Sequence, residues 1–219
     1  VNHNGNISMA LDLIESAANA GADFIKFQTF KADNIVTKTA IKAPYQIKSG
    51  KCSETQYKML KRLELNHEMH ETLIERCRDK NIGFLSSAFD LDSIDYLISL
   101  GIAFIKIPSG EITNFPYLKR VGKAGKSIIL STGMANDQEV KNAISVLTQA
   151  GADKEDITIL HCNSEYPTPM LDVNLQAMCS MKKQFKTKVG YSDHTIGIEI
   201  PIAAVALGAT VIEKHFTLN

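Results

Sequence analysis

Two histidines, His194 and His215, follow two short apolar strands near the end of the sequence and could approach one metal ion or one substrate. The segment between them, 197–207, is apolar and predicts a buried helix that crosses back over those strands. Parallel strands joined by such a crossover end at the same edge of their sheet. Neutral imidazole is a common metal ligand, so the spacing fits a two-histidine site, although a single histidine is more often structural.

Polar side chains also follow the other apolar strands that the sequence predicts. In chain order they are Lys26 and Gln28, Ser86 and Ser87, Lys106 with Ser109 and Glu111, Ser131 and Thr132, His161 with Asn163 and Ser164, Ser192 and Asp193 before His194, and Lys214 before His215. Lys26 and Lys106 interrupt apolar strands, where an ammonium group is costly unless an anion pairs with it. Serine hydroxyls beside two such lysines predict a site for phosphate or carboxylate. Serines also cap helices, so each serine taken singly carries little weight.

These residue types suit a metal-assisted reaction of a phosphorylated or carboxylated small molecule. An aldolase that forms a Schiff base on Lys26 or Lys106 is the alternative that the same residues allow. It would require a lysine that is deprotonated at neutral pH, and no metal. The histidine pair argues against it.

A repeated pattern indicates which elements position these groups. A helix, a glycine and a strand follow one another in AGADFIKFQT at 20–29, LGIAFIKIPSGE at 100–111 and LGATVIEKHFT at 207–217. Glycine ends helices because it accepts the left-handed conformation. The same alternation predicts strands at 23–28, 82–86, 103–107, 127–131, 156–161, 187–191 and 210–214. It predicts helices at 7–19, 54–64, 67–80, 90–99, 115–123, 137–149, 174–184 and 197–207, with Asn136 as a cap.

This alternation predicts the α/β class and a TIM (β/α)8 barrel. The segment 1–5 has the composition of a loop that leaves a strand, so we expect a barrel that lacks its first strand and last helix in this sequence. Residues 1–219 would then be one barrel domain, truncated at both ends. The long polar insertion at 30–53 is expected to form a lid or a substrate contact.

Composition narrows the class of partner. The 219 residues are 44% hydrophobic, enough for one core, and lysine plus arginine equals aspartate plus glutamate at 24 each. There is no basic surplus for nucleic acid and no apolar run long enough for a membrane span, so a small-molecule partner is expected. The four cysteines form no CxxC pair, which favours reduced thiols in a cytoplasmic protein.

Seven ordered motifs give the chain a family resemblance. They are NHNG at 2–5, GADFIKFQTF at 21–30, KIPSGE at 106–111, ILSTGM at 129–134, EYPTP at 165–169, GYSDHT at 190–195 and ATVIEKHFT at 209–217. Together they resemble the bacterial sialic acid synthase family, which contains N-acetylneuraminate and N,N'-diacetyllegionaminate synthases. NHNG and KFQTF resemble these two branches more than the pseudaminate branch.

The resemblance implies a transferase that makes a nonulosonic (sialic) acid. Family members condense phosphoenolpyruvate with N-acetylmannosamine or a related N-acetylated aldose, and they release phosphate with carbon–oxygen cleavage. The resemblance makes His194 and His215 the ligands of Mn2+ or Mg2+. Phosphoenolpyruvate would be held by Lys26, Ser87, Lys106, Ser109, Ser131, Ser164 and Ser192. Gln28, Tyr166 and His215 would face the sugar, and Glu111 would orient the reacting centre or activate water.

Departures from the family bear on the sugar site. Family members carry a glutamate on the first strand, and an acidic sugar contact and a small antifreeze-like domain after the barrel. That domain supplies an arginine to the partner's site in a homodimer, and none of these parts is in the sequence. Two alternatives stay open. A synthase of a keto-deoxy sugar acid phosphate would need a second phosphate site, for which no arginine cluster is evident, and a noncatalytic sugar-binding fragment is opposed by the histidine pair.

Overall fold

The computed structural model describes residues 2–42 and 54–218. They form two compact units, one made of residues 2–42, 54–100 and 217–218 and the other of residues 101–216. The single barrel domain expected from the sequence stays a prediction. Within the described residues no helix is both long and apolar enough to cross a membrane.

The first unit contains two parallel strands, β1 (Phe24–Thr29) and β2 (Gly83–Ala88). Its helices are α1 (Ile7–Asn19), α2 (Ala32–Ile35), α4 (Gln56–Leu63), α5 (His67–Asp79) and α6 (Leu91–Ser99). Ile25 and Phe27 of β1 pack in one core cluster with residues of α1 and α5. Because side chains alternate along a strand, Lys26 and Gln28 lie on the opposite face of β1. Gln28 is in register with Ser87, which places Ser87 on that face too.

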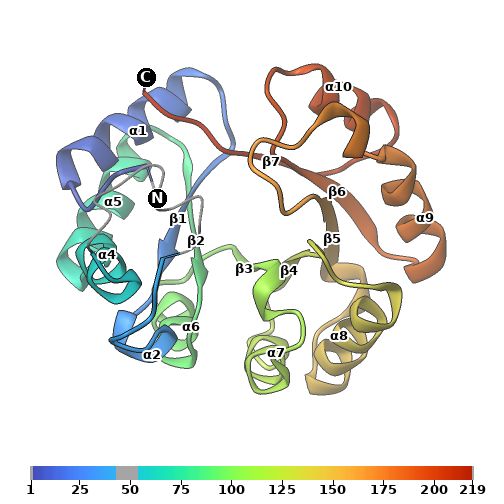
Figure 1. Cartoon of the computed structure of the whole chain (residues 1–219), viewed down its shortest axis with the longest axis horizontal. Coiled ribbons are helices and arrows are strands. Elements are labelled where there is room, and N and C mark those ends of the chain that lie inside the picture. Colours follow the sequence, from blue (N-terminus) through green and yellow to red (C-terminus); the bar gives the residue numbers. More distant parts are fainter. Residues whose placement is uncertain (1, 43–53, 219) are drawn as a thin grey trace. The chain divides into compact units, whose positions relative to one another are not determined.

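The second unit contains five parallel strands that are neighbours in chain order. They are β3 (Phe104–Ile107), β4 (Ser127–Ser131), β5 (Ile157–Cys162), β6 (Lys188–Asp193) and β7 (Ile212–Lys214). The connecting helices are α7 (Phe115–Gly122), α8 (Asp137–Ala150), α9 (Leu175–Phe185) and α10 (Glu199–Ala206). All four lie on one side of these strands (Figure 1). Val189 and Tyr191 of β6 pack with residues of α9 and α10, so the other side of the strands is the face without helices.

The predicted α/β class, all seven strands and all eight helices are confirmed, with ends within about two residues of those expected. Asn136 caps α8 in a capping box with Glu139. Gly21 and Gly208 have φ of +77° and +94°, as the repeated helix–glycine–strand pattern predicts. Helix α2 was not predicted, and it lies in the long polar insertion, whose residues 43–53 fall outside the described part.

Helix α10 differs from the expectation of a buried helix. Ile202 and Val205 are 62% and 56% exposed, and only Ala204 of this helix is buried in the described structure. After Glu199 at its start, α10 consists of proline and apolar residues only, so its sequence has no polar face to mark the exposed side. The prediction of burial was therefore wrong for the outer side of α10.

Candidate active site

The helix-free face of the second unit gathers a row of polar side chains near the strand ends. The register pairs Cys162 with Ser192 and Ser192 with Glu213, so the three side chains point to the same face. Lys106 is in register with Ile129, and Ser131 follows two residues later on the same face of β4. The row therefore consists of Lys106, Ser131, Cys162, Ser192 and Glu213.

Lys106 is the buried cation of this row. Its side chain is only 2% exposed, and its Nζ donates hydrogen bonds to Ser131 Oγ at 2.7 Å and to the Ile107 carbonyl at 3.3 Å. Glu213 Oε1 lies 3.9 Å from the same Nζ. An ammonium group so far from solvent favours an anion beside it. Lys106 and Ser131, both predicted for the anion site, thus lie in contact, and their binding of an anion stays a prediction.

Glu213 was missed by the sequence analysis. Ser192 Oγ donates to its Oε1 at 3.0 Å, and the same hydroxyl lies 3.5 Å from Nε2 of His194. The alternation of side chains along β7 could have found it, because Glu213 shares the parity of His215. The sequence analysis named Lys214 at this strand end instead.

His194 and His215 are brought together as predicted. Their ring centroids are 5.3 Å apart, and the ring of Tyr166 lies 4.3 Å from the first and 5.9 Å from the second. Nδ1 of His194 is 2.6 Å from the Asn163 carbonyl. A carbonyl oxygen only accepts, so Nδ1 carries the proton and the lone pair of Nε2 faces the site.

This donor set fits a divalent ion. A backbone carbonyl that orients the far nitrogen of an imidazole is the usual support of a metal-ligating histidine. The described residues contain no group of three or more His, Cys, Asp or Glu side chains that could hold a metal. Any ion here would therefore complete its coordination with solvent or substrate, as Mn2+ and Mg2+ commonly do.

Ser109 and Ser164 converge on Gly133. A Cβ at Gly133, whose φ is +46°, would lie 2.6 Å from Ser109 Oγ and 3.1 Å from Ser164 Oγ. The two serines thus flank one turn after β4. Glu111 ends the 3-10 helix Ser109–Glu111, and its Oε2 accepts from the side-chain Nδ2 of Asn114 at 2.7 Å, just before α7 begins. This contact ties Glu111 to a helix start, and its catalytic role stays a prediction.

Two polar residues named at strand ends point to the helices instead. Ser86 Oγ is 2.7 Å from Thr29 Oγ1, which is 2.8 Å from Nε2 of the buried His70. Nε2 of His161 is 2.9 Å from the Val173 carbonyl. Burial lowers the pKa of both histidines, so they stay neutral structural groups. Both had been noted as polar residues at strand ends, and the alternation of strand side chains turns them away from the helix-free face.

Asp193 and Lys214 form a second structural pair on the helix side. Asp193 is fully buried, and Lys214 donates to its Oδ2 and to the Thr195 carbonyl at 2.8 Å. Asp193 Oδ1 accepts from the amide and hydroxyl of Thr195 at 2.9 and 2.8 Å. The pair therefore holds the backbone on both sides of His194. They too had been noted as polar residues at strand ends, and their contribution to the site is indirect.

Cys162 is an acceptor rather than a nucleophile. Its Sγ accepts from the amide of Gly133 at 3.1 Å, and burial raises the pKa of the thiol. Cys77, Cys162 and Cys179 are free thiols, as predicted, and Cys52 lies outside the described residues.

In the first unit, Lys26 and Gln28 are half-buried on the helix-free face of β1, and Ser87 is buried on the same face of β2. These positions agree with the side of the strands on which the sequence analysis placed them. Their contacts with substrate stay predictions.

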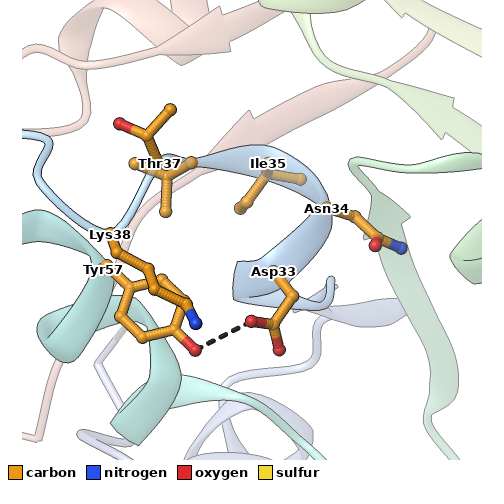
Figure 2. A pocket seen from close by; sticks show the side chains of 7 residues that line it. Asp33, Asn34, Ile35, Thr37, Lys38 and Tyr57 are labelled. Carbon is orange, nitrogen blue, oxygen red and sulfur yellow. Dashed lines mark hydrogen bonds between the residues drawn. The ribbon is translucent and has the colours of Figure 1, made fainter.

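The first unit also holds a cavity of about 460 Å³ at the long polar insertion. Figure 2 shows Asp33, Thr37, Lys38 and Tyr57 around it, from α2, the segment after it and α4. The Tyr57 hydroxyl donates to Asp33 at 2.8 Å, and this hydrogen bond is the main reason why the pKa of Asp33 is lowered. None of the predicted site residues lines this cavity, so we place the chemistry at the strand ends.

The fold is a parallel α/β fold, and a buried lysine, serine hydroxyls and paired imidazoles at its strand ends are groups suited to binding a small anion. Residues 13–219 match the NeuB family, and the chain belongs to that family. The resemblance seen in the motifs is thereby confirmed.

Three relatives show how far the likeness extends. The chain is 57% identical over 219 residues to the N,N'-diacetyllegionaminic acid synthase of Campylobacter jejuni, covering 100% of this chain and 66% of that protein. It is 51% identical over 221 residues to the synthase of the same name from Legionella pneumophila, covering 100% and 62%. The crystal structure of the N-acetylneuraminic acid synthetase of Leptospira borgpetersenii, solved with citrate, matches with a TM-score of 0.85 and 33% identity, covering 100% of this chain and 70% of that one. The chain thus spans about two thirds of the length of the curated relatives.

Proposed function

We propose that the protein is a nonulosonic acid synthase, which condenses phosphoenolpyruvate with an N-acetylated aldose and releases phosphate. The observation that carries this proposal is the buried Lys106, bonded to Ser131, on the same face as the paired His194 and His215. Both curated relatives named above are N,N'-diacetyllegionaminic acid synthases, which favours a diacetylated 6-deoxy sugar over N-acetylmannosamine as acceptor.

The anion site would orient phosphoenolpyruvate. Lys106, Ser131 and Ser192 offer one ammonium and two hydroxyl groups, which match the oxygen atoms of phosphate or carboxylate. Lys26, Ser87, Ser109 and Ser164 are proposed to add to this set by the family resemblance. Holding the substrate in one orientation presents its methylene carbon to the second substrate. This lowers the entropic part of the activation free energy of the condensation.

The imidazole pair would hold a divalent ion, Mn2+ or Mg2+. Nε2 of His194 and the ring of His215 are the proposed ligands, and such an ion supplies Lewis-acid polarisation of the sugar carbonyl when bound. Tyr166 lies against both rings, where its hydroxyl and ring could contact the sugar, as could Gln28.

The reaction balances without an oxidant or reductant. The methylene carbon of phosphoenolpyruvate forms a bond to the aldehyde carbon of the open-chain sugar, whose oxygen takes up a proton, and water adds to the adjacent phosphate-bearing carbon and loses a proton. Cleavage of the carbon–oxygen bond then releases phosphate and leaves the keto acid. Glu111 is proposed to orient that water, and Lys106 to hold the departing phosphate.

The proposed architecture is a complete TIM barrel in the whole protein. The exposed apolar side of α10 supports it, because a helix that is apolar all round normally packs on two sides. A cytoplasmic homodimer is proposed by the family resemblance alone.

Phosphate release by the full-length protein tests the function. We expect release with phosphoenolpyruvate, Mn2+ and the diacetylated 6-deoxy sugar, less with N-acetylmannosamine, and none in chelator. Release only with a phosphorylated aldose would favour the keto-deoxy sugar acid phosphate alternative. Sugar binding that needs no metal, with no release of phosphate, would favour the hypothesis of a noncatalytic sugar-binding protein.

A further inference from the structure

The carboxylate of Glu213 stands inside a site whose other groups suit an anion. Its Oε1 accepts from Ser192 Oγ at 3.0 Å and lies 3.9 Å from Nζ of Lys106. The side chain of Glu213 is 22% exposed, and that of Lys106 only 2%. Water therefore screens the attraction between Lys106 and Glu213 less than it screens a pair of surface charges.

The hydroxyl and the ammonium that contact Glu213 are the same groups that would bind the substrate anion. A phosphate or carboxylate arriving there competes with Glu213 for Lys106 and Ser192. It also places a second negative charge close to the first, and like charges at such distances disfavour each other. The Glu213 carboxylate thus already contacts the groups proposed to bind the substrate anion.

A divalent ion would remove this penalty. Ser192 Oγ lies between Glu213 Oε1, at 3.0 Å, and His194 Nε2, at 3.5 Å. The proposed metal site is therefore next to the carboxylate, and a cation there would offset the negative charge of Glu213. Lys106 would then be available to the substrate anion.

We propose that Glu213 makes anion binding depend on metal binding, as an internal competitor for Lys106 that a divalent ion neutralises. This inference rests on the proposed function for the identity of the anion. Thermodynamic linkage requires that the coupling be reciprocal, so the anion tightens metal binding by the same factor.

Isothermal titration calorimetry on the full-length protein tests the coupling, with phosphoenolpyruvate and inorganic phosphate as separate probes, in chelator and in Mn2+. For the wild type we expect Mn2+ to tighten anion binding about tenfold, which corresponds to about 1.4 kcal/mol. Glu213→Gln keeps an acceptor for Ser192 but removes the charge. In chelator it should bind the anion about tenfold more tightly than the wild type, and Mn2+ should then add little. A plain structural role for Glu213 predicts weaker binding instead.

Glu165→Gln is the matched control, because Glu165 is an exposed carboxylate in the loop after β5. It should behave as the wild type does. The proposal is overturned if Glu213→Gln binds anions in chelator no more tightly than the wild type, or if the tightening by Mn2+ is unchanged. It is also overturned if no anion binds to either protein.

The two proposals fail separately. Binding of phosphate without binding of phosphoenolpyruvate would contradict the proposed function, while the coupling is still measured on phosphate. If Glu213→Gln does not fold, Mn2+ titration of the wild type by electron paramagnetic resonance, with and without phosphate, measures the reciprocal coupling. An unchanged Mn2+ affinity would then overturn the inference.

Discussion

The buried pair of Asp193 and Lys214 makes a quantitative prediction about the stability of the loop that carries His194. Lys214→Met removes the ammonium group and leaves the fully buried Asp193 carboxylate to the Thr195 amide and hydroxyl. Removing one partner of a buried ion pair typically costs about 3–5 kcal/mol. Lys214 is 32% exposed, so water already screens part of the interaction, and we expect a loss of about 2 kcal/mol.

Thermal unfolding and urea titration measure this loss. For a chain of this size, about 2 kcal/mol lowers the Tm by roughly 4–8 °C. Lys188→Met is the matched control, because Lys188 is an exposed lysine on β6, and it should change stability by less than about 0.5 kcal/mol.

A second substitution separates charge from packing. Asp193→Asn in the Lys214→Met background removes the stranded charge while an amide oxygen still accepts from Thr195. We expect it to recover at least half of the lost stability. Equal losses in Lys214→Met and Lys188→Met, or no recovery in the double variant, would refute the argument that a buried charge is the cause.

Three further perturbations have expected outcomes. Burial lowers the pKa of His70, so the unfolded chain binds the proton first and stability is lost as pH falls below about 6.5. Urea titrations from pH 8 to 5 should show a smaller loss of unfolding free energy in His70→Gln than in the wild type. An equal loss in both proteins would contradict this. Gly133→Ala places a methyl group 2.6 Å from Ser109 Oγ, so the KM for phosphoenolpyruvate should rise about tenfold, and an unchanged KM would remove Ser109 from the site. His215→Ala should weaken Mn2+ binding by at least about tenfold in a calorimetric titration, and full affinity would exclude it as a ligand.

The elements were predictable because glycine and hydrophobic runs mark them plainly. Gly21 and Gly208 adopt the left-handed conformation that the repeated pattern requires, and Asn136 and Glu139 form the cap expected at α8. Lys106 was found because a lysine inside an apolar strand stands out in the sequence.

The face on which each strand-end residue lies was harder to predict. Strand β7 has only three residues, and two neighbours among them, Glu213 and Lys214, are polar, so residue type alone did not show which one faces the site; only the parity with His215 does. His161 and Ser86 failed for the same reason, since polar residues occur on both faces at these strand ends. The exposed side of α10 could not be inferred from the sequence, because Ile202 and Val205 on that side are as apolar as the residues of a fully buried helix.

The alternation at the end of β6 and in β7 also has a consequence for how the chain finds its native pairing. Ser192 faces Glu213, while Asp193 faces Lys214, one residue further on. A slip of β7 by one position would set the Lys214 ammonium among the anion-binding groups and turn the carboxylate of Glu213 toward the helices, away from Lys106 and Ser192. Both neighbouring pairs therefore favour the same register of β7. The charges on the site face and the ion pair on the helix face each destabilise a pairing that is shifted by one residue.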